Sequence, residues 1–214
     1  MDMKASVRSE NHLKVVEIIL LLVLAVFLAS GASAVQTQDE LAEKVVRLHV
    51  LANSDSEEDQ ALKLQVRDAV LSRAEYLLEA ASDRKEAEGI LRGQLLEFES
   101  VARETIREAG YDYPVSVELM DTEFPTKRYT GFVLPAGEYL ALRVLIGEAE
   151  GQNWWCVVYP PLCAAVSMNA PVTALAIGFS EEEIGLITEE NPRYELKFKT
   201  VELWETLRQK LKNV

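Results

Sequence analysis

Two apolar runs separated by a short polar loop constrain the fold of this chain more than any other stretch. Leu140 to Ile146 and Trp154 to Tyr159 are rich in the β-branched, aromatic and aliphatic residues that suit a pleated, half-buried surface. The loop between them reads GEAEGQN, and Pro160 with Pro161 ends the second run because proline cannot donate to a strand ladder. The pattern predicts a β-hairpin with a long loop.

The N-terminal segment is predicted to be a signal peptide. Three bases precede an uncharged run from Ile18 to Ala29, and Ala32-Ser33-Ala34 follows that run, which is the order of a basic region, an apolar region and a cleavage site. We therefore expect residues 1–34 to be removed, which leaves a single extracytoplasmic domain over residues 35–214. An uncleaved membrane anchor is the alternative, and it would need a longer apolar span.

Charge and cysteine usage narrow the functional class. The net charge of −13 lies wholly on residues 35–214, because residues 1–34 carry equal numbers of acids and bases. Such a chain is repelled by nucleic acid, so nucleic-acid binding is excluded as a main function. We also expect no small-molecule substrate and no cofactor. Export permits a disulfide, and Cys156 with Cys163 is the predicted pair. Two buried thiols are the alternative.

The remaining pattern predicts an α+β fold, with a mainly antiparallel sheet packed with a helical hairpin and a C-terminal helix. In the strand Val45 to Ala52, Arg47 and His49 alternate with apolar residues and so share one face. The other expected elements are a capping turn at Asn53 to Asp59, a helix from about Asp59 to Ala81, a second helix from Ser82-Asp83 to about Ala109 whose Gly89 and Gly93 allow close helix approach, strands at Pro114 to Met120 and Thr126 to Val133, a short helix from Ser180, and a last helix from about Thr200 to Lys212.

Candidate catalytic residues are few. His49 is the only histidine left after cleavage, so a two-histidine zinc site cannot form, and the calcium-loop pattern from Asn53 to Leu64 lacks its glycine and its terminal glutamate. A thiol nucleophile would pair His49 with Cys156 or Cys163. We favour instead a histidine packed on a strand face and two paired cysteines. Glu148 and Glu150 are the carboxylates available for acid–base chemistry, although loop glutamates are usually solvated.

A partner-binding surface is predicted at the end of the polar loop. Gln152 and Asn153 lead into Trp154 and Trp155, and strand alternation sends the two rings to opposite faces. One ring can then lie in the core while the other is exposed, and exposed tryptophans commonly anchor interfaces.

Two stretches resemble the stage II sporulation protein R family of spore-forming Firmicutes. They are Arg47 to Asp68, RLHVLANSDSEEDQALKLQVRD, and Gly137 to Cys163, in which GQNWWCVVYPPLC is most specific. The resemblance implies a signalling protein that is made in the forespore, exported into the space between the forespore and mother-cell membranes, and needed to activate a membrane-embedded aspartic protease in the mother cell.

That protease then removes the pro-sequence of sigma-E. The resemblance thus implies a binding module without enzymatic activity, whose partner is the protease. An extracytoplasmic enzyme that acts on the cell wall through Glu148, Glu150 or Cys156 is the alternative.

Overall fold

The computed structural model describes residues 17–22, 25, 38, 40–129, 132–162 and 179. The chain divides into two compact units, one made of Met1–Thr37 with Glu195–Val214 and one of Gln38–Tyr194. Residues 17–22 and 25 of the first unit are helical. No helix within the described ranges is long and apolar enough to cross a membrane. The helices expected from Ser180 and from Thr200 to Lys212 lie outside the described residues, and the signal peptide stays a prediction.

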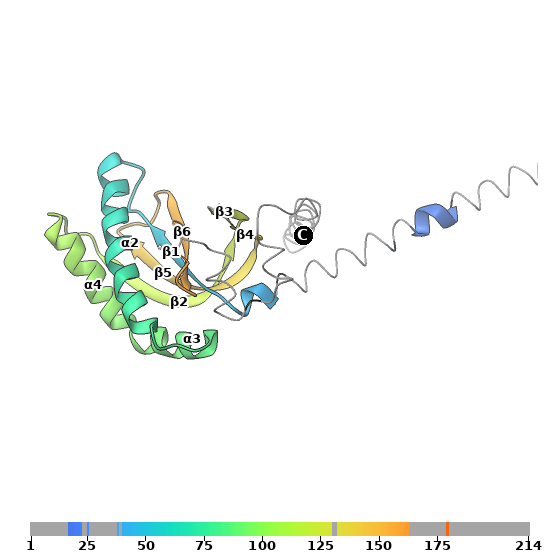
Figure 1. Ribbon diagram of the computed structural model, residues 1–214. Coiled ribbons are helices and arrows are strands. Elements are labelled where there is room, and N and C mark those ends of the chain that lie inside the picture. Colours follow the sequence, from blue (N-terminus) through green and yellow to red (C-terminus); the bar gives the residue numbers. More distant parts are fainter. Residues whose placement is uncertain are drawn as a thin grey trace, which may run out of the picture. The chain divides into compact units, whose positions relative to one another are not determined.

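The second unit is built on a four-stranded sheet, drawn in Figure 1. The strand order is β2 (Val115–Phe124), β5 (Gly137–Ile146), β1 (Val46–Leu51) and β6 (Asn153–Tyr159). Pairs β2–β5 and β1–β6 are antiparallel, whereas β1 and β5 run parallel. The predicted α+β class with a mainly antiparallel sheet is confirmed.

The predicted hairpin between the two apolar runs is wrong, because β1 lies between β5 and β6. The first five residues of β1 are all buried, as is usual for a central strand that is covered on both faces. The chain after β5 crosses the end of β1 instead of turning back directly. There the backbone N–H of Gly151 donates to Ala52 O at 3.0 Å, and that of Glu150 donates to Asn53 O at 3.3 Å.

Three helices cover one face of the sheet (Figure 1). They are α2 (Glu57–Leu78), α3 (Arg84–Gly93) and α4 (Leu95–Glu108). The predicted caps are confirmed: the Ser56 hydroxyl accepts from Asp59 N at 3.1 Å, and the Asp83 carboxylate accepts from Glu86 N at 2.8 Å. Gly110, with φ of +86°, ends α4 in the left-handed conformation that glycine adopts without strain.

The second predicted helix is interrupted. Gln94 leaves the helical conformation, with φ of −117° and ψ of 13°, and separates α3 from α4. Gly93 directly precedes this break, and glycine is the weakest helix former after proline. The expectation that Gly89 and Gly93 let helices approach closely is wrong, because no atom lies within 4 Å of a Cβ built on either residue.

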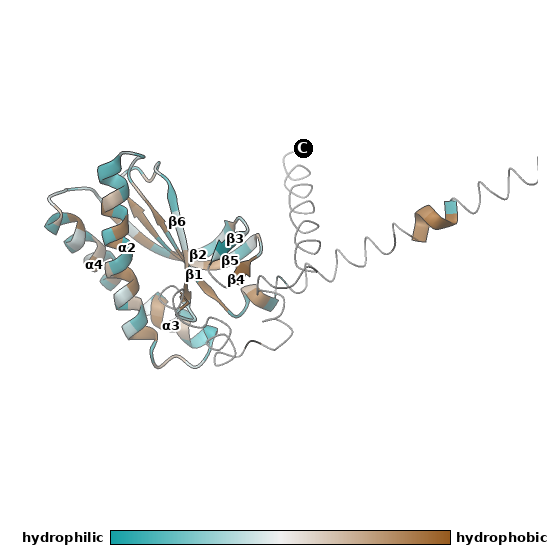
Figure 2. Cartoon of the chain, turned by 45° about the horizontal axis from the view of Figure 1, so that its top comes forward, coloured by the Kyte–Doolittle hydropathy of each residue, from teal (hydrophilic) through white to brown (hydrophobic). Residues whose placement is uncertain are grey.

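Alternate residues of each strand enter different cores. On the helix side, β1 contributes Val46, Leu48 and Val50 to the larger cluster, as the alternation predicted. The opposite side holds a smaller cluster with a short hairpin, β3 (Lys127–Tyr129) and β4 (Phe132–Leu134), where one continuous strand was expected. In Figure 2 the central strands are largely hydrophobic, whereas the helices carry a mixture of hydrophilic and hydrophobic residues.

Candidate functional site

The stretches 47–68 and 137–162 meet in the structure at one end of the sheet. Their strands pair, and their loops bind one another. The Asn53 amide oxygen accepts from Glu148 N at 3.0 Å, and the Asp55 carboxylate accepts from Gln152 N at 2.7 Å. From α2, the buried Lys63 ammonium donates to Gln152 O at 2.9 Å. These bonds fix the position of the loop that precedes β6.

Asp59 organises the first of these loops. Its carboxylate accepts from Ser54 Oγ at 2.6 Å and from Asn53 Nδ2 at 2.8 Å, and it lies in the first turn of α2. The bond from Ser54, with further help from Asn53, lowers the pKa of Asp59 against the opposing effect of burial. Asp59 is therefore ionised at neutral pH and holds the loop against the helix N-terminus, where negative charge is favourable.

The two tryptophans point to opposite faces of the sheet, as predicted. Trp154 lies on the helix side, where the Arg67 guanidinium of α2 is 4.2 Å from the ring centroid. Trp155 lies on the other side and stacks on His49 with ring centroids 5.9 Å apart, while the Lys127 ammonium lies 3.7 Å from its centroid. Trp154 is 37% exposed, and Trp155 is half-buried against the smaller cluster.

The four predicted partner-binding residues therefore do not lie on a single surface. Gln152, Asn153 and Trp154 are exposed at the start of β6. Asn153 also holds His49, since its side-chain oxygen is 2.6 Å from Nε2 of the ring. The exposed part of the predicted site is thus the start of β6, here called the ridge. The Asn153 side chain lies on the face of His49, and the Trp154 ring lies on the helix side against Arg67.

Basic side chains on the face opposite the helices were missed by sequence reasoning. Arg47 is wholly buried, with its guanidinium 4.0 Å from the Phe124 centroid, 5.0 Å from that of Tyr139 and 2.7 Å from the Tyr129 hydroxyl. Burial lowers the pKa of Arg47, but an arginine keeps its charge in proteins. The alternation of Arg47 with apolar residues was visible in the sequence; the rings that surround it come from distant strands and were not.

The same face holds His49 and Arg143 side by side on paired strands. The Arg143 guanidinium bonds to the Glu118 carboxylate at 2.6 Å. Burial lowers the pKa of His49 more than the bond to Asn153 raises it. His49 is therefore neutral at neutral pH, although it lies beside several cationic groups.

The geometry does not assemble the considered catalytic sets. Cys156 belongs to the helix-side core, whereas His49 faces the other side, so these two residues cannot form a thiol–imidazole pair. The side chains of Glu148 and Glu150 are exposed. Cys163 lies outside the described residues, so its pairing with Cys156 stays a prediction. In the described part of the chain, no three His, Cys, Asp or Glu side chains are grouped closely enough to hold a metal ion.

Two comparisons with known proteins match the same family. The family model for stage II sporulation protein R matches residues 42–169, which is more than half of the chain and includes strands β1 to β6 and helices α2 to α4. Stage II sporulation protein R of Bacillus subtilis (strain 168) is 39% identical over 147 residues, which is 64% of this chain and 66% of that protein. The chain thus matches slightly less than two thirds of the relative's length. No solved structure matches the chain.

Proposed function

The chain belongs to the stage II sporulation protein R family, and on that premise we propose that it is a secreted intercellular signal of endospore formation. Family membership supports a role in sporulation. Beyond that role, we propose that the chain leaves the forespore, enters the space between the two membranes and activates the membrane-embedded aspartic protease that processes pro-sigma-E. The signal-peptide pattern of residues 1–34 supports export; anchoring through an uncleaved segment is the second possibility for its location.

A signal of this kind acts through differential affinity. If the protease exchanges between an inactive and an active form, a ligand that binds the active form more tightly shifts the population towards it. The ligand itself needs no catalytic group. What it needs is a defined contact surface whose residues do not have to be ordered at the moment of binding, because such ordering reduces affinity.

The exposed Trp154 ring is the observation that best supports a contact surface. Arg67 stacks on one side of it, so the ring is held in place before a partner arrives. Its neighbours Gln152 and Asn153 are exposed beside it, while hydrogen bonds to Asp55 and Lys63 fix the backbone of Gln152. Tryptophan and arginine are the residue types most enriched among residues that dominate binding energy. We propose that Gln152, Asn153 and Trp154 contact the protease.

The experiment compares two exposed aromatic residues that each lie against an arginine. Trp154 lies against Arg67, and Tyr76 of α2 is 69% exposed with Arg73 5.0 Å from its ring centroid. Trp154→Ala should lower pro-sigma-E processing in sporulating cells by about tenfold or more, as expected for a residue that dominates an interface. Tyr76→Ala should leave processing near the wild-type level. Normal processing with a folded Trp154→Ala chain, checked by circular dichroism, places the contact elsewhere.

A wall-acting hydrolase is the other candidate function, because Glu148 and Glu150 are exposed carboxylates on one loop. The combined variant Glu148→Gln and Glu150→Gln keeps the size of both side chains and removes their charge. A ligand should retain signalling in this variant, since the backbone bonds of the loop remain. Loss of signalling with an intact fold, together with release of soluble wall fragments by the wild-type chain alone, favours the hydrolase.

A further inference from the structure

One row of side chains crosses the whole sheet on the face opposite the helices. Pairing aligns Glu118 of β2 with Arg143 of β5, Arg143 with His49 of β1, and His49 with Trp155 of β6. Directly opposed residues in a sheet have Cβ atoms about 5 Å apart, so these four side chains form one continuous strip, here called the polar row. The next row towards the loops contains Leu145 and Leu51, both half-buried, and the exposed Asn153.

The polar row contains nitrogens that have no hydrogen-bond partner among the residues that the structure describes. They are Nε of Arg143 and Nδ1 of His49, both buried, and within the same described residues Nε and Nη1 of the neighbouring Arg47 are also without a partner. A buried polar atom without a partner is costly, and a buried charge without a counter-charge is more so. Arg47 is fully buried and His49 is 7% exposed, so bulk water does not compensate these groups.

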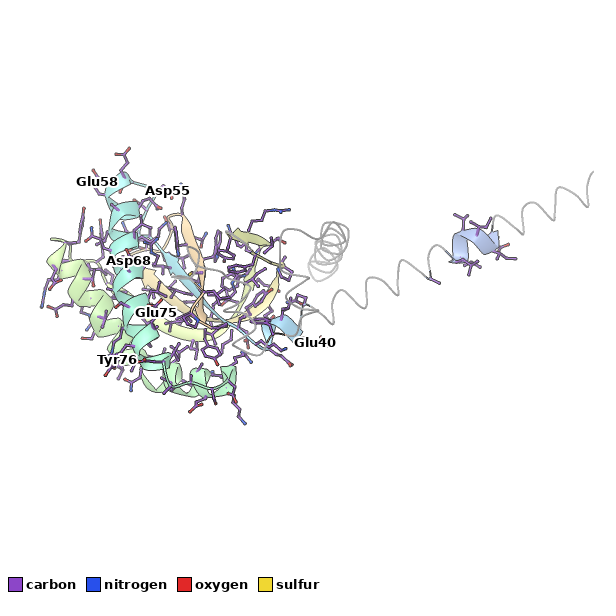
Figure 3. All side chains as sticks on the ribbon, in the orientation of Figure 1. Glu40, Asp55, Glu58, Asp68, Glu75 and Tyr76 are labelled. Atoms are coloured by element: carbon purple, nitrogen blue, oxygen red, sulfur yellow. The ribbon has the colours of Figure 1, made fainter. Side chains whose placement is uncertain are left out.

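The face is positive in a chain that is strongly negative overall. Arg47, Arg143 and Lys127 all point to this side, and Glu118, already bound to Arg143, is the one carboxylate that the described strands place on it. By contrast, the acidic Asp55, Glu58, Asp68 and Glu75 lie along α2, in the helix layer on the other side of the sheet (Figure 3). Among the residues that the structure describes, negative charge is therefore concentrated on the helix side of the sheet.

We propose that the open half of this face binds an acidic, partly apolar segment of the partner protein, with a side-chain carboxylate placed between Arg143 and Lys127 beside Trp155. The carboxylate supplies an acceptor for Nε of Arg143 and a counter-charge for Lys127. The half-buried leucines of the next row accept an apolar side chain. The inner half of the face is covered by Phe132 and Leu134 of β4, so the segment is confined to the end near the loops. Only the identity of the partner rests on the proposed function; the chemistry of recognition does not.

Two neighbouring cations of β3 provide a matched pair of variants. Lys127 faces Trp155, whereas the next residue, Arg128, is exposed and alternation points it to the other side of its strand. Lys127→Gln and Arg128→Gln each remove one positive charge from the same short strand. Both variants therefore change the net charge equally. A difference in binding affinity between them reports a local contact of Lys127.

The measurement is titration of the purified full-length chain with two synthetic peptides, acetyl-Leu-Asp-Leu-Asp-Leu-amide and its counterpart with Asn at both Asp positions. Binding is followed by the indole N–H resonance of Trp155. We expect the Asp peptide to bind and to shift this resonance, and the Asn peptide to bind at least about tenfold more weakly, as expected when a desolvated charge pair is lost. Lys127→Gln should lower the affinity for the Asp peptide by about fivefold to tenfold, and Arg128→Gln should lower it by less than about twofold.

Three results overturn the proposal. They are equal affinity for the two peptides, equal effects of Lys127→Gln and Arg128→Gln, or Lys127-dependent binding to phosphatidylglycerol vesicles without peptide binding, which makes the face a lipid-binding surface instead. The titration contains no protease, so its failure leaves the signalling role untouched. Conversely, normal pro-sigma-E processing by Trp154→Ala does not affect the peptide result.

Discussion

At the scale of single residues, three polar side chains in β1 and in the nearby start of α2 have different electrostatic environments. Asp59 is stabilised in its charged form by hydroxyl and amide donors, whereas His49 is stabilised in its neutral form by burial. Arg47 is charged, buried and surrounded by aromatic rings, which offset part of the cost of removing a charge from water. These settings predict separate responses to mutation and to pH.

Removing the charge of Asp59 should destabilise the fold. Asp59→Asn replaces a carboxylate by an amide, which weakens the bonds from Ser54 and Asn53, and the expected loss is about 1–3 kcal/mol of unfolding free energy. Asp68, on the same helix but 63% exposed, is the control, and Asp68→Asn should change stability by less than about 0.5 kcal/mol. Urea unfolding of both variants and the wild type at neutral pH measures these losses. An Asp59→Asn chain as stable as the wild type would show that the bonds of Asp59 to the loop do not stabilise the fold.

The burial of His49 predicts a loss of stability on mild acidification. The pKa of His49 in the folded chain lies below its ordinary value of 6.5, so the unfolded chain takes up the proton first as the pH falls. The contribution of the neutral His49 to the free energy of unfolding is complete above pH 6.5. It is lost as the pH falls from 6.5 to the pKa of His49 in the folded chain. The polar and charged groups that act on the ring are Asn153, Arg143 and Arg47, and the lowered pKa of Asp59 acts only in a more acidic range, below its usual value of 3.8.

The corresponding measurement is the free energy of unfolding between about pH 7.5 and pH 5, where histidine titrates. The wild type should lose stability as the pH falls through this window. His49→Gln, which has no proton to gain, should give a flatter profile. Identical slopes for the two chains contradict the assignment of the effect to His49.

At the scale of elements, the loop after β1 and the loop before β6 are in direct contact. Gly151 lies where they touch, and a Cβ added there meets Ser54 O at 2.2 Å and Ala52 Cβ at 2.9 Å. Gly151→Ala should therefore destabilise the fold by about 1–3 kcal/mol, the usual cost of overpacking.

The control for Gly151 is the same substitution at an open site. Gly89 lies in α3 with nothing within 4 Å of an added Cβ, so Gly89→Ala should stabilise the fold by about 0.5–1 kcal/mol through helix propensity. Thermal unfolding of both variants separates the predictions by sign. A Gly151→Ala chain as stable as the wild type is incompatible with the observed approach of the two loops.

The sequence predicts the local features of these elements well, but it does not predict which strands lie next to one another in the sheet. The alternation of Arg47 and His49, the Ser56 cap and the opposed tryptophan rings follow from residues close together in the chain. The position of β1 between β5 and β6 does not, because parallel pairing such as Arg47 with Ala141 joins residues far apart in sequence. Lys127 and Arg143 were missed as site residues for this reason: their chemistry appears only once distant strands are side by side.

At the scale of the whole molecule, export predicts a disulfide between Cys156 and Cys163. Cys156 is buried. A bridge to Cys163 closes a short loop, and by the loop-closure relation it should add about 2–2.5 kcal/mol to the free energy of unfolding. Intact mass with and without reductant, followed by alkylation of the denatured, unreduced chain, tests the pairing. Two alkylated cysteines would mean that no bridge forms. A bridge with normal signalling in the double Cys→Ser variant would mean that it only supports the fold.

The central claim is that the ridge at the start of β6 meets the protease, and site-specific photocrosslinking tests it most directly. A photoreactive phenylalanine replaces Gln152, whose side chain is exposed, and in a second chain it replaces Tyr76, which is exposed on α2. The chains are mixed with the membrane portion of the protease and irradiated. The account predicts a crosslinked product from position 152 and little or none from position 76. Crosslinking from position 76 but not from 152 would contradict it.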